Sequence, residues 1–196
     1  MVPGDDSPDP ELTGLSNVPA VDVERLWQFL RQGGAGNALQ LFNCIASHWL
    51  QRDYSWIEPQ PLPRVGLYHP ELSNPTLADW QANWQAGAPV AALLFYRTQV
   101  QAANTGFIDV FCQRLQAQGL NPLPIAVASL KEAACLTQVE DWLDEADARL
   151  IINTTAFAIS NPEAPDLCPF RRSVPVLQAI CALDNHAQWQ ANAQGL

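Results

Sequence analysis

Residues 88–120, APVAALLFYRTQVQAANTGFIDVFCQRLQAQGL, contain the part of the sequence that decides the fold. Within it, the almost uninterrupted apolar run Val90–Tyr96 is typical of a strand buried on both faces of a parallel sheet. After a polar connection, the apolar side chains of residues 107–115 recur at helical spacing, which indicates a helix packed on that sheet.

This helix has recognisable start and stop residues. Asn104 or Thr105 is predicted to cap its first turn, because a side-chain oxygen there accepts hydrogen bonds from free backbone N–H groups. Gly119 is predicted to end it in the left-handed conformation. The stretch therefore predicts one complete βα unit.

The sequence on either side predicts further strands and helices in alternation. Pro122 and Pro124 remove backbone donors from the strand that follows the helix, which places that strand at or near an edge of the sheet. The predicted strands are residues 64–68, 90–96, 123–127, 149–153 and 174–183, and the predicted helices include 73–86 and 137–148. This alternation predicts an α/β fold: a Rossmann-like or flavodoxin-like parallel sheet of four to five strands, preceded by a helical N-terminal segment.

Three regions are expected along the chain. Residues 1–18, rich in Pro, Asp and Gly, predict a disordered acidic N-terminus. Residues 19–60 predict a helical hairpin with a glycine-rich turn at 33–36 and Asn37 as the cap of the second helix. Its inward-facing side chains are expected to be Val23, Leu26, Trp27, Leu30, Leu39, Leu41, Phe42, Ile45 and Trp49. Residues 61–196 predict the α/β domain, which is expected to be truncated at its C-terminus because no closing element follows.

Composition excludes several functional classes. The net charge is −10 and Lys131 is the single lysine, so binding to nucleic acid or to anionic membranes is not expected. The sequence has neither a signal peptide nor an apolar run of membrane-spanning length, so a cytoplasmic location is expected. Five scattered cysteines without a C-x-x-C pair predict reduced, mostly buried thiols.

Polar residues follow the predicted strands at their carboxyl ends, where open α/β sheets bind ligands. The candidate ligand-binding residues are Arg97, Asn104, Thr105, Asn153 and Thr154, and they suit a ligand that carries carboxylates or amides. Arg97 is the strongest candidate, because a cation at a strand end needs an explanation that a threonine does not. The alternative is that these residues are caps and turn formers, which strand ends need in any case.

The sequence offers little for catalysis by this segment alone. The connection 97–103 lacks the glycines of nucleotide-binding loops, so direct binding of NAD or ATP is not expected. Cys44 and His48 lie four residues apart on a predicted helix, so they could share one face. A metal site needs three or four convergent ligands, however, and this pair supplies two. The preferred interpretation is therefore a buried cysteine beside a surface histidine. No metal-binding and no catalytic residue is assigned.

Several motifs, taken together and in order, resemble the CobN-type large subunit of aerobic cobaltochelatases over residues 60–183. The H subunit of magnesium chelatase is similar in the same region, more distantly. The motifs are VGLYHP at 65–70, VAALLFYR at 90–97, Asn104-Thr105, NPLPI at 121–125, Ser129-Leu130-Lys131, LIINTTAF at 150–157 and VPVLQ at 174–178.

The resemblance implies a role in inserting a metal into a tetrapyrrole ring: cobalt into hydrogenobyrinic acid a,c-diamide on the way to cobalamin, or magnesium into protoporphyrin. It implies two partners, an AAA+ ATPase subunit and a subunit with an integrin-like domain. The whole complex would use cobalt and ATP, with no cofactor bound by this segment. Because such subunits exceed a thousand residues, this chain is expected to be a fragment that is inactive alone. The alternatives are a non-catalytic tetrapyrrole-binding or scaffolding fragment, a magnesium chelatase H-like subunit, and a domain that senses an unrelated small ligand.

Overall fold

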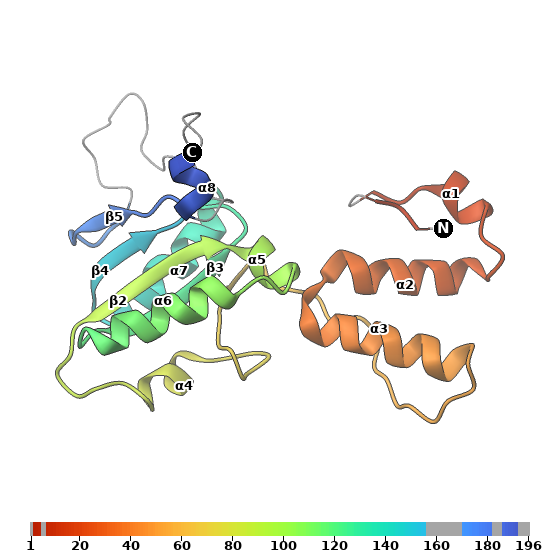
Figure 1. Ribbon diagram of the computed structural model, residues 1–196, viewed down its shortest axis with the longest axis horizontal. Helices are drawn as coiled ribbons and strands as arrows, with labels where there is room; N and C mark the ends of the chain where they lie inside the picture. The colour runs from red at the N-terminus through yellow and green to blue at the C-terminus, as the bar shows by residue number, and fades with distance from the viewer. Residues whose placement is uncertain (1, 5–6, 156–169, 182–185, 192–196) are drawn as a thin grey trace. The chain divides into compact units, whose positions relative to one another are not determined.

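A computed structural model describes residues 2–4, 7–155, 170–181 and 186–191 (Figure 1). The chain divides into two compact units. The helical unit comprises residues 1–63 and 98–104, and the α/β unit comprises residues 64–97 and 105–196. A loop is also expected from the three prolines of residues 161–172, and most of this stretch, including Cys168, lies outside the described residues.

The helical unit contains α1 (Pro10–Gly14), α2 (Ala20–Gln32) and α3 (Gly34–His48). Helix α1 falls within the region predicted to be disordered. It forms because Asp9 caps it, accepting a hydrogen bond of 3.0 Å from the Leu12 N–H, and because proline is favourable at its first position. Helices α2 and α3 form a hairpin around Gly33, as the glycine-rich turn predicts.

The inward face of the hairpin was only partly identified from the sequence. Its buried apolar residues include Val23, Trp27, Phe29 and Cys44. The prediction that Leu30, Leu39 and Phe42 face inward is wrong, because these three side chains are 52%, 58% and 67% exposed. Helical periodicity identifies an apolar face, but it does not say whether a neighbouring element covers that face.

Asn37 has a different role from the predicted helix cap. Helix α3 already begins at Gly34, which places Asn37 inside its first turn. Its amide nitrogen donates to the carbonyls of Gly33 and Gln60, both at 2.9 Å, and its side-chain oxygen accepts from the Gln60 N–H, also at 2.9 Å. The buried Asn37 side chain therefore fixes the segment that follows the hairpin, because it satisfies backbone groups from two parts of the chain.

Ion pairs also attach residues 56–58, in the segment that follows the hairpin, to α2. Arg25 forms ion pairs with Asp22 (2.8 Å) and with Glu58 (3.0 Å), and its guanidinium lies 5.3 Å from the ring centroid of Trp56. Trp56 in turn meets the buried Phe29 edge to face. These contacts join residues 56–58 to α2.

The α/β unit is a five-stranded sheet in the order β1-β3-β2-β4-β5. Its strands are β1 (Val65–Leu67), β2 (Val90–Tyr96), β3 (Asn121–Val127), β4 (Ala148–Asn153) and β5 (Val176–Gln178). The helices of this unit are α4 (Leu77–Gln81), α6 (Gly106–Ala117), α7 (Ala133–Glu145) and α8 (His186–Ala191). The short helix α5 (Arg97–Gln101) follows β2, and from residue 98 it belongs to the helical unit. The predicted α/β fold with a mainly parallel sheet is therefore confirmed.

Strand β2 has the predicted bounds and lies at the centre of the sheet. It pairs in parallel with β3 along its whole length, from Val90 opposite Asn121 to Tyr96 opposite Val127, and in parallel with β4 on its other side. Helices α6 and α7 cover opposite faces of the sheet (Figure 1). An apolar strand without alternation is expected where both faces are covered in this way.

Two features at the ends of β2 and α6 differ from the prediction. Residues 97–101, expected to be a polar connection, form the short helix α5. Thr105 occupies the position before α6, but its side chain makes no capping hydrogen bond, so the predicted side-chain cap is wrong. At the other end, Gly119 is left-handed with φ of 74°, as predicted.

Strand β3 lies one strand in from the edge, as its prolines predict. Its odd-numbered residues direct their backbone groups to β2, and the Asn121 N–H donates to the Pro89 carbonyl. Pro122 and Pro124 face the opposite side, where only their carbonyls are needed: these accept from the Trp84 indole N–H (3.1 Å) and the Tyr68 N–H (3.0 Å). The edge strand β1 is antiparallel to β3, which the sequence does not predict.

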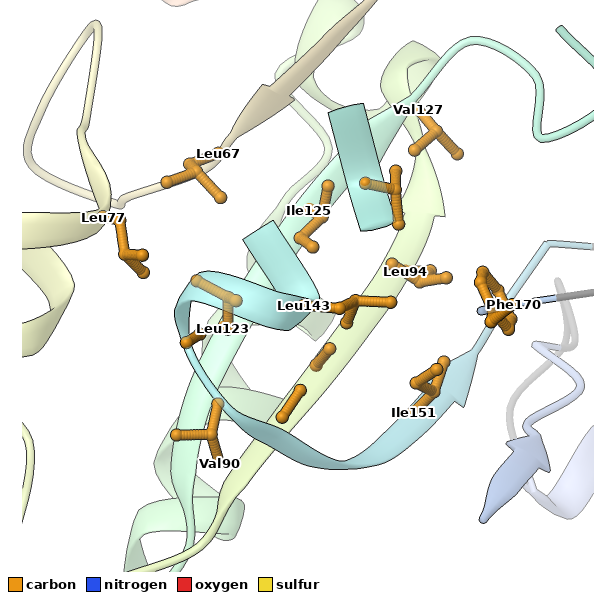
Figure 2. Packing of buried hydrophobic residues seen from close by; sticks show 14 of the residues in the cluster. Leu67, Leu77, Val90, Leu94, Leu123, Ile125, Val127, Leu143, Ile151 and Phe170 are labelled. Atoms are coloured by element: carbon orange, nitrogen blue, oxygen red, sulfur yellow. The ribbon is translucent and has the colours of Figure 1, made fainter. Parts of the chain in front are cut away.

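The core follows from the alternation of side chains along β2. Leu94 points to the α7 face, where it belongs to a cluster with Val139 and Leu143 of α7 and Ile125 of β3 (Figure 2). The intervening residues Ala91, Leu93 and Phe95 are equally buried and belong to the α6 face, because successive side chains of a strand point to opposite faces.

The turn between α2 and α3 gives a prediction about stability. Gly33 has φ of 64°, and a Cβ atom there would lie 2.5 Å from the Gln101 carbonyl oxygen. Gly33→Ala is therefore expected to lower the free energy of unfolding by more than about 1 kcal/mol, since both the backbone and the contact oppose a side chain. Thermal unfolding followed by circular dichroism at the helical band measures this change.

Gly36→Ala is the matched control for that substitution. Gly36 lies within α3, and a Cβ atom there meets nothing within 4 Å. Its replacement is expected to raise stability by about 0.5–1 kcal/mol through helix propensity alone. Equal shifts of the two variants in the same direction would contradict this account of the turn.

Candidate functional site

The carboxyl ends of β2 and β4 are the position in this sheet where a ligand is expected. After β2 the chain passes to β3, which lies on one side of β2, whereas after β4, the neighbour of β2 on its other side, the chain passes to β5 in the opposite direction. Connections that leave two neighbouring strands in opposite directions mark the usual ligand position of an open α/β sheet. Arg97 follows β2 at this point, and Asn153 ends β4.

Asn153 and Thr154 use their polar atoms within the sheet. Asn153 is 2% exposed; its amide nitrogen donates to the Gln178 side-chain oxygen at 2.8 Å, and its own oxygen accepts from the N–H and hydroxyl of Thr155. Thr154 donates to the Leu94 carbonyl of β2 through both its N–H and its hydroxyl, each at 2.9 Å. These contacts join the ends of β2, β4 and β5 to one another.

The other three candidate residues occupy different settings. Arg97 is the first residue of α5, directly after β2, and is partly exposed. Thr105 precedes α6, and its hydroxyl acts to lower the pKa of Tyr68. Asn104 is exposed and belongs to the helical unit. The structure thus places Arg97, Asn153 and Thr154 at the ends of adjacent strands, and it places Thr105 at the start of α6; ligand binding by these residues stays a prediction.

A partly buried hydrogen bond close to Thr105 was missed by sequence reasoning. The Tyr68 hydroxyl donates to Asp109 of α6 at 2.8 Å, and its ring meets Phe95 of β2 edge to face at 5.9 Å. Burial raises the pKa of Tyr68 to about 12, and the neighbouring Asp109 carboxylate acts in the same direction, while the hydrogen bond with Thr105 opposes them. Tyr68 and Asp109 are 41 residues apart, so nothing local in the sequence relates them.

The thiols and carboxylates do not form a metal centre in the described parts of the chain. Among the residues that the structure describes, no three His, Cys, Asp or Glu side chains converge on one point. Cys44 is buried and the His48 side chain is 51% exposed, with its ring 3.7 Å from Asp22, in agreement with the preferred interpretation of that pair. Cys112 and Cys135 are buried too, and burial raises the pKa of Cys112 to about 12, so its thiol stays protonated at neutral pH.

The contacts of Asn153 predict a structural cost for its removal. Asn153→Ala leaves the buried Thr155 hydroxyl without its acceptor and the Gln178 side-chain oxygen without its donor, and it is expected to reduce the free energy of unfolding by about 1–3 kcal/mol. Urea unfolding of this variant, beside the exposed Asn104→Ala with an expected change within about 0.5 kcal/mol, measures the difference. An unchanged midpoint for Asn153→Ala would show that these hydrogen bonds do not hold the strand ends.

The raised pKa of Tyr68 predicts a pH dependence of stability. A tyrosine whose pKa is higher in the folded protein than the ordinary value of 10.0 contributes stability that is complete below pH 10 and is lost as the pH rises toward 12. The stability of the wild-type chain is therefore expected to fall more steeply between pH 10 and 12 than that of Tyr68→Phe. Parallel curves for the two proteins, measured by urea unfolding at several pH values, would contradict the assignment.

Among the described helices, none combines the length and apolar composition that crossing a bilayer requires.

Comparison with known proteins relates this chain to metal chelatases. It is 68% identical over 195 residues to aerobic cobaltochelatase subunit CobN of Pseudomonas aeruginosa, and 32% identical over 206 residues to the subunit of the same name from a Sinorhizobium species. Each match covers 100% of this chain and 16% of the relative.

A solved structure gives the same relationship. The catalytic subunit of cobaltochelatase from Mycobacterium tuberculosis matches with a TM-score of 0.71 and 26% sequence identity, over 98% of this chain and 16% of that one. The chain thus spans about a sixth of the length of these relatives. Residues 27–196 match the family model described as CobN/Magnesium Chelatase. The chain belongs to the CobN/magnesium chelatase family.

Proposed function

We propose that this chain is part of the large subunit of an ATP-dependent cobaltochelatase, which acts in the cytoplasm and inserts cobalt into hydrogenobyrinic acid a,c-diamide during cobalamin biosynthesis. The observation that carries the proposal is the 68% identity, over the whole chain, to a subunit named for aerobic cobaltochelatase. The match extends through the sheet and its helices, so it concerns the whole folded region and not one short motif.

Within that subunit we assign this segment to the tetrapyrrole side of the reaction. A corrinoid precursor presents carboxylates and amides at its periphery, and a guanidinium at a strand end suits such groups through charge-assisted hydrogen bonds. Arg97 would contact the substrate, with Thr105 and Asn104 near the start of α6 as further polar partners. Asn153 and Thr154 would position the strand ends beside it, since their own hydrogen-bonding groups are engaged with Gln178, Thr155 and Leu94.

Cobalt insertion and ATP hydrolysis are proposed to use other parts of the complex. The connection after β2 is the short helix α5, and it lacks the glycines that a phosphate-binding loop requires. ATP would be hydrolysed by an AAA+ subunit, which acts together with a subunit that carries an integrin-like domain. This segment would contribute a wall of the tetrapyrrole cavity or a docking surface for those partners.

Two alternatives are kept. The family name includes magnesium chelatase, so the same fold is compatible with an H-like subunit that receives protoporphyrin. A non-catalytic tetrapyrrole-binding or scaffolding fragment is the second, because the chain spans only about a sixth of its cobaltochelatase relatives.

The substrate-binding role of Arg97 is tested in a full-length subunit carrying this sequence, together with its partner subunits, ATP and cobalt. Removing one charge-assisted hydrogen bond costs about 1.5–3 kcal/mol, so Arg97→Ala is expected to weaken binding of hydrogenobyrinic acid a,c-diamide by at least about tenfold. Tryptophan quenching reports binding, and the change in corrinoid absorbance reports cobalt insertion.

Arg149→Ala is the matched control, because Arg149 is an exposed arginine at the amino end of β4, paired with Asp147. It is expected to bind the corrinoid like the wild type. Equal affinity of Arg97→Ala and Arg149→Ala would remove Arg97 from the site while leaving the chelatase assignment intact. Insertion of magnesium into protoporphyrin, without cobalt insertion, would instead favour the H-like alternative.

A further inference from the structure

The two edge strands of the sheet, β1 and β5, differ in how far other parts of the chain cover them. At the β1 edge, the strand is short and antiparallel, Leu67 is buried, and the Trp80 indole N–H donates to the Tyr68 carbonyl at 2.8 Å. Trp80 belongs to the short helix α4, which has a complete capping box between Thr76 and Asp79. The β1 edge therefore has a buried apolar side chain and a helix bonded beside it, which are common protections of an edge strand.

The β5 edge lacks such protection among the described residues. Strand β5 is the last strand of the sheet order and pairs with β4 alone, in parallel. The Pro175 carbonyl accepts from Ile151 and the Ala179 N–H donates to Asn153, so alternate residues face β4. The backbone N–H and C=O groups of Val176 and Gln178 therefore point to the outer edge, where they can pair with another strand.

The side chains of β5 are apolar on both faces of the sheet. Val176 is opposite Ile151, which faces α7, and Leu177 is opposite Ile152 on the other face. Val176 is 38% exposed, Leu177 is 54% exposed and Ile180 is 68% exposed. The stretch 173–181, SVPVLQAIC, contains no charged residue, although charged residues are a common protection of exposed edges.

We infer that β5 is an internal strand in the full-length subunit, where a further β-strand and its crossover helix from the remaining polypeptide pair with its outer edge. The unpaired backbone groups and the exposed apolar side chains of β5 indicate which kind of polypeptide would pair with it. A parallel strand satisfies the free backbone groups of Val176 and Gln178, its side chains pack beside those of Val176 and Leu177, and its crossover helix covers one face of β5. The relatives supply the polypeptide, since this chain covers only 16% of their length.

A second copy of this chain fits the surface less well. Pairing of two β5 edges would satisfy the backbone groups, but it would leave Leu177 on one face and Val176 on the other exposed to water. A strand–helix unit also supplies a helix that covers apolar side chains on one face of β5, which a strand alone does not.

Amide hydrogen exchange tests this inference on two proteins: the 196-residue chain and a full-length subunit carrying the same sequence. The Val176 and Gln178 amides are expected to exchange at least roughly 100-fold more slowly in the full-length subunit. The Ala179 amide, which donates to Asn153 at 2.9 Å in this chain, is expected to be protected in both and serves as the internal control.

A pair of lysine substitutions adds a second readout. Leu177→Lys is expected to leave the thermal midpoint of the 196-residue chain unchanged, because the side chain is exposed there, and to lower the midpoint of the full-length subunit. Gln116→Lys, at an exposed position of α6, is the matched control and is expected to change neither. Leu177→Ala keeps the comparison possible if the lysine variant of the full-length subunit does not fold.

Three results would overturn the inference. Slow exchange at Val176 and Gln178 already in the 196-residue chain would mean that this chain closes its own edge. A concentration-dependent dimer of the chain that Leu177→Lys dissociates would assign the edge to a second copy. Protection that appears only when partner subunits are added would assign it to them. The inference rests on family membership and on the length of the relatives, so a subunit that inserts no metal still tests it.

Discussion

The α/β unit depends on the burial of one strand. β2 pairs along its length with β3 and β4, and its residues from Val90 to Phe95 are at most 6% exposed. Because all side chains of β2 except Tyr96 are buried, α6 and α7 are both needed to shield the two faces of the strand from solvent. The register of β2 also fixes where β4 ends, and therefore where Arg97 and Asn153 come into the same neighbourhood.

The polar residues at the strand ends divide between an architectural role and the binding role proposed above. Asn153 is fully engaged with Thr155 and Gln178, so it defines the shape of the strand ends and offers a ligand little. Arg97 begins a helix instead of ending a loop, which holds its backbone in one conformation. In the proposed binding role, an arginine held in this way would need little reorganisation when substrate binds.

How far the sequence could predict this structure varied with the range of the interactions. The bounds of β2, the left-handed Gly119 and the near-edge position of β3 follow from local chemistry, and all were predicted. The exposure of Phe42, the role of Asn37 and the contact between Tyr68 and Asp109 depend on residues distant in the sequence, and the sequence analysis missed them or assigned them wrongly. For the candidate site, sequence located the strand ends correctly, but it could not tell which polar groups were already satisfied by Gln178 or Leu94.

Pro122 and Pro124 have a consequence for how the sheet assembles. On the side of β3 that faces β1, these two residues offer carbonyls and no N–H groups, so a long strand bonded through a regular ladder cannot form there. A strand exchanged from another molecule, or paired one residue out of register, would find donors missing at alternate positions. The prolines therefore disfavour incorrect strand pairing on the β1 side of β3, whereas the β2 side keeps a complete set of backbone donors.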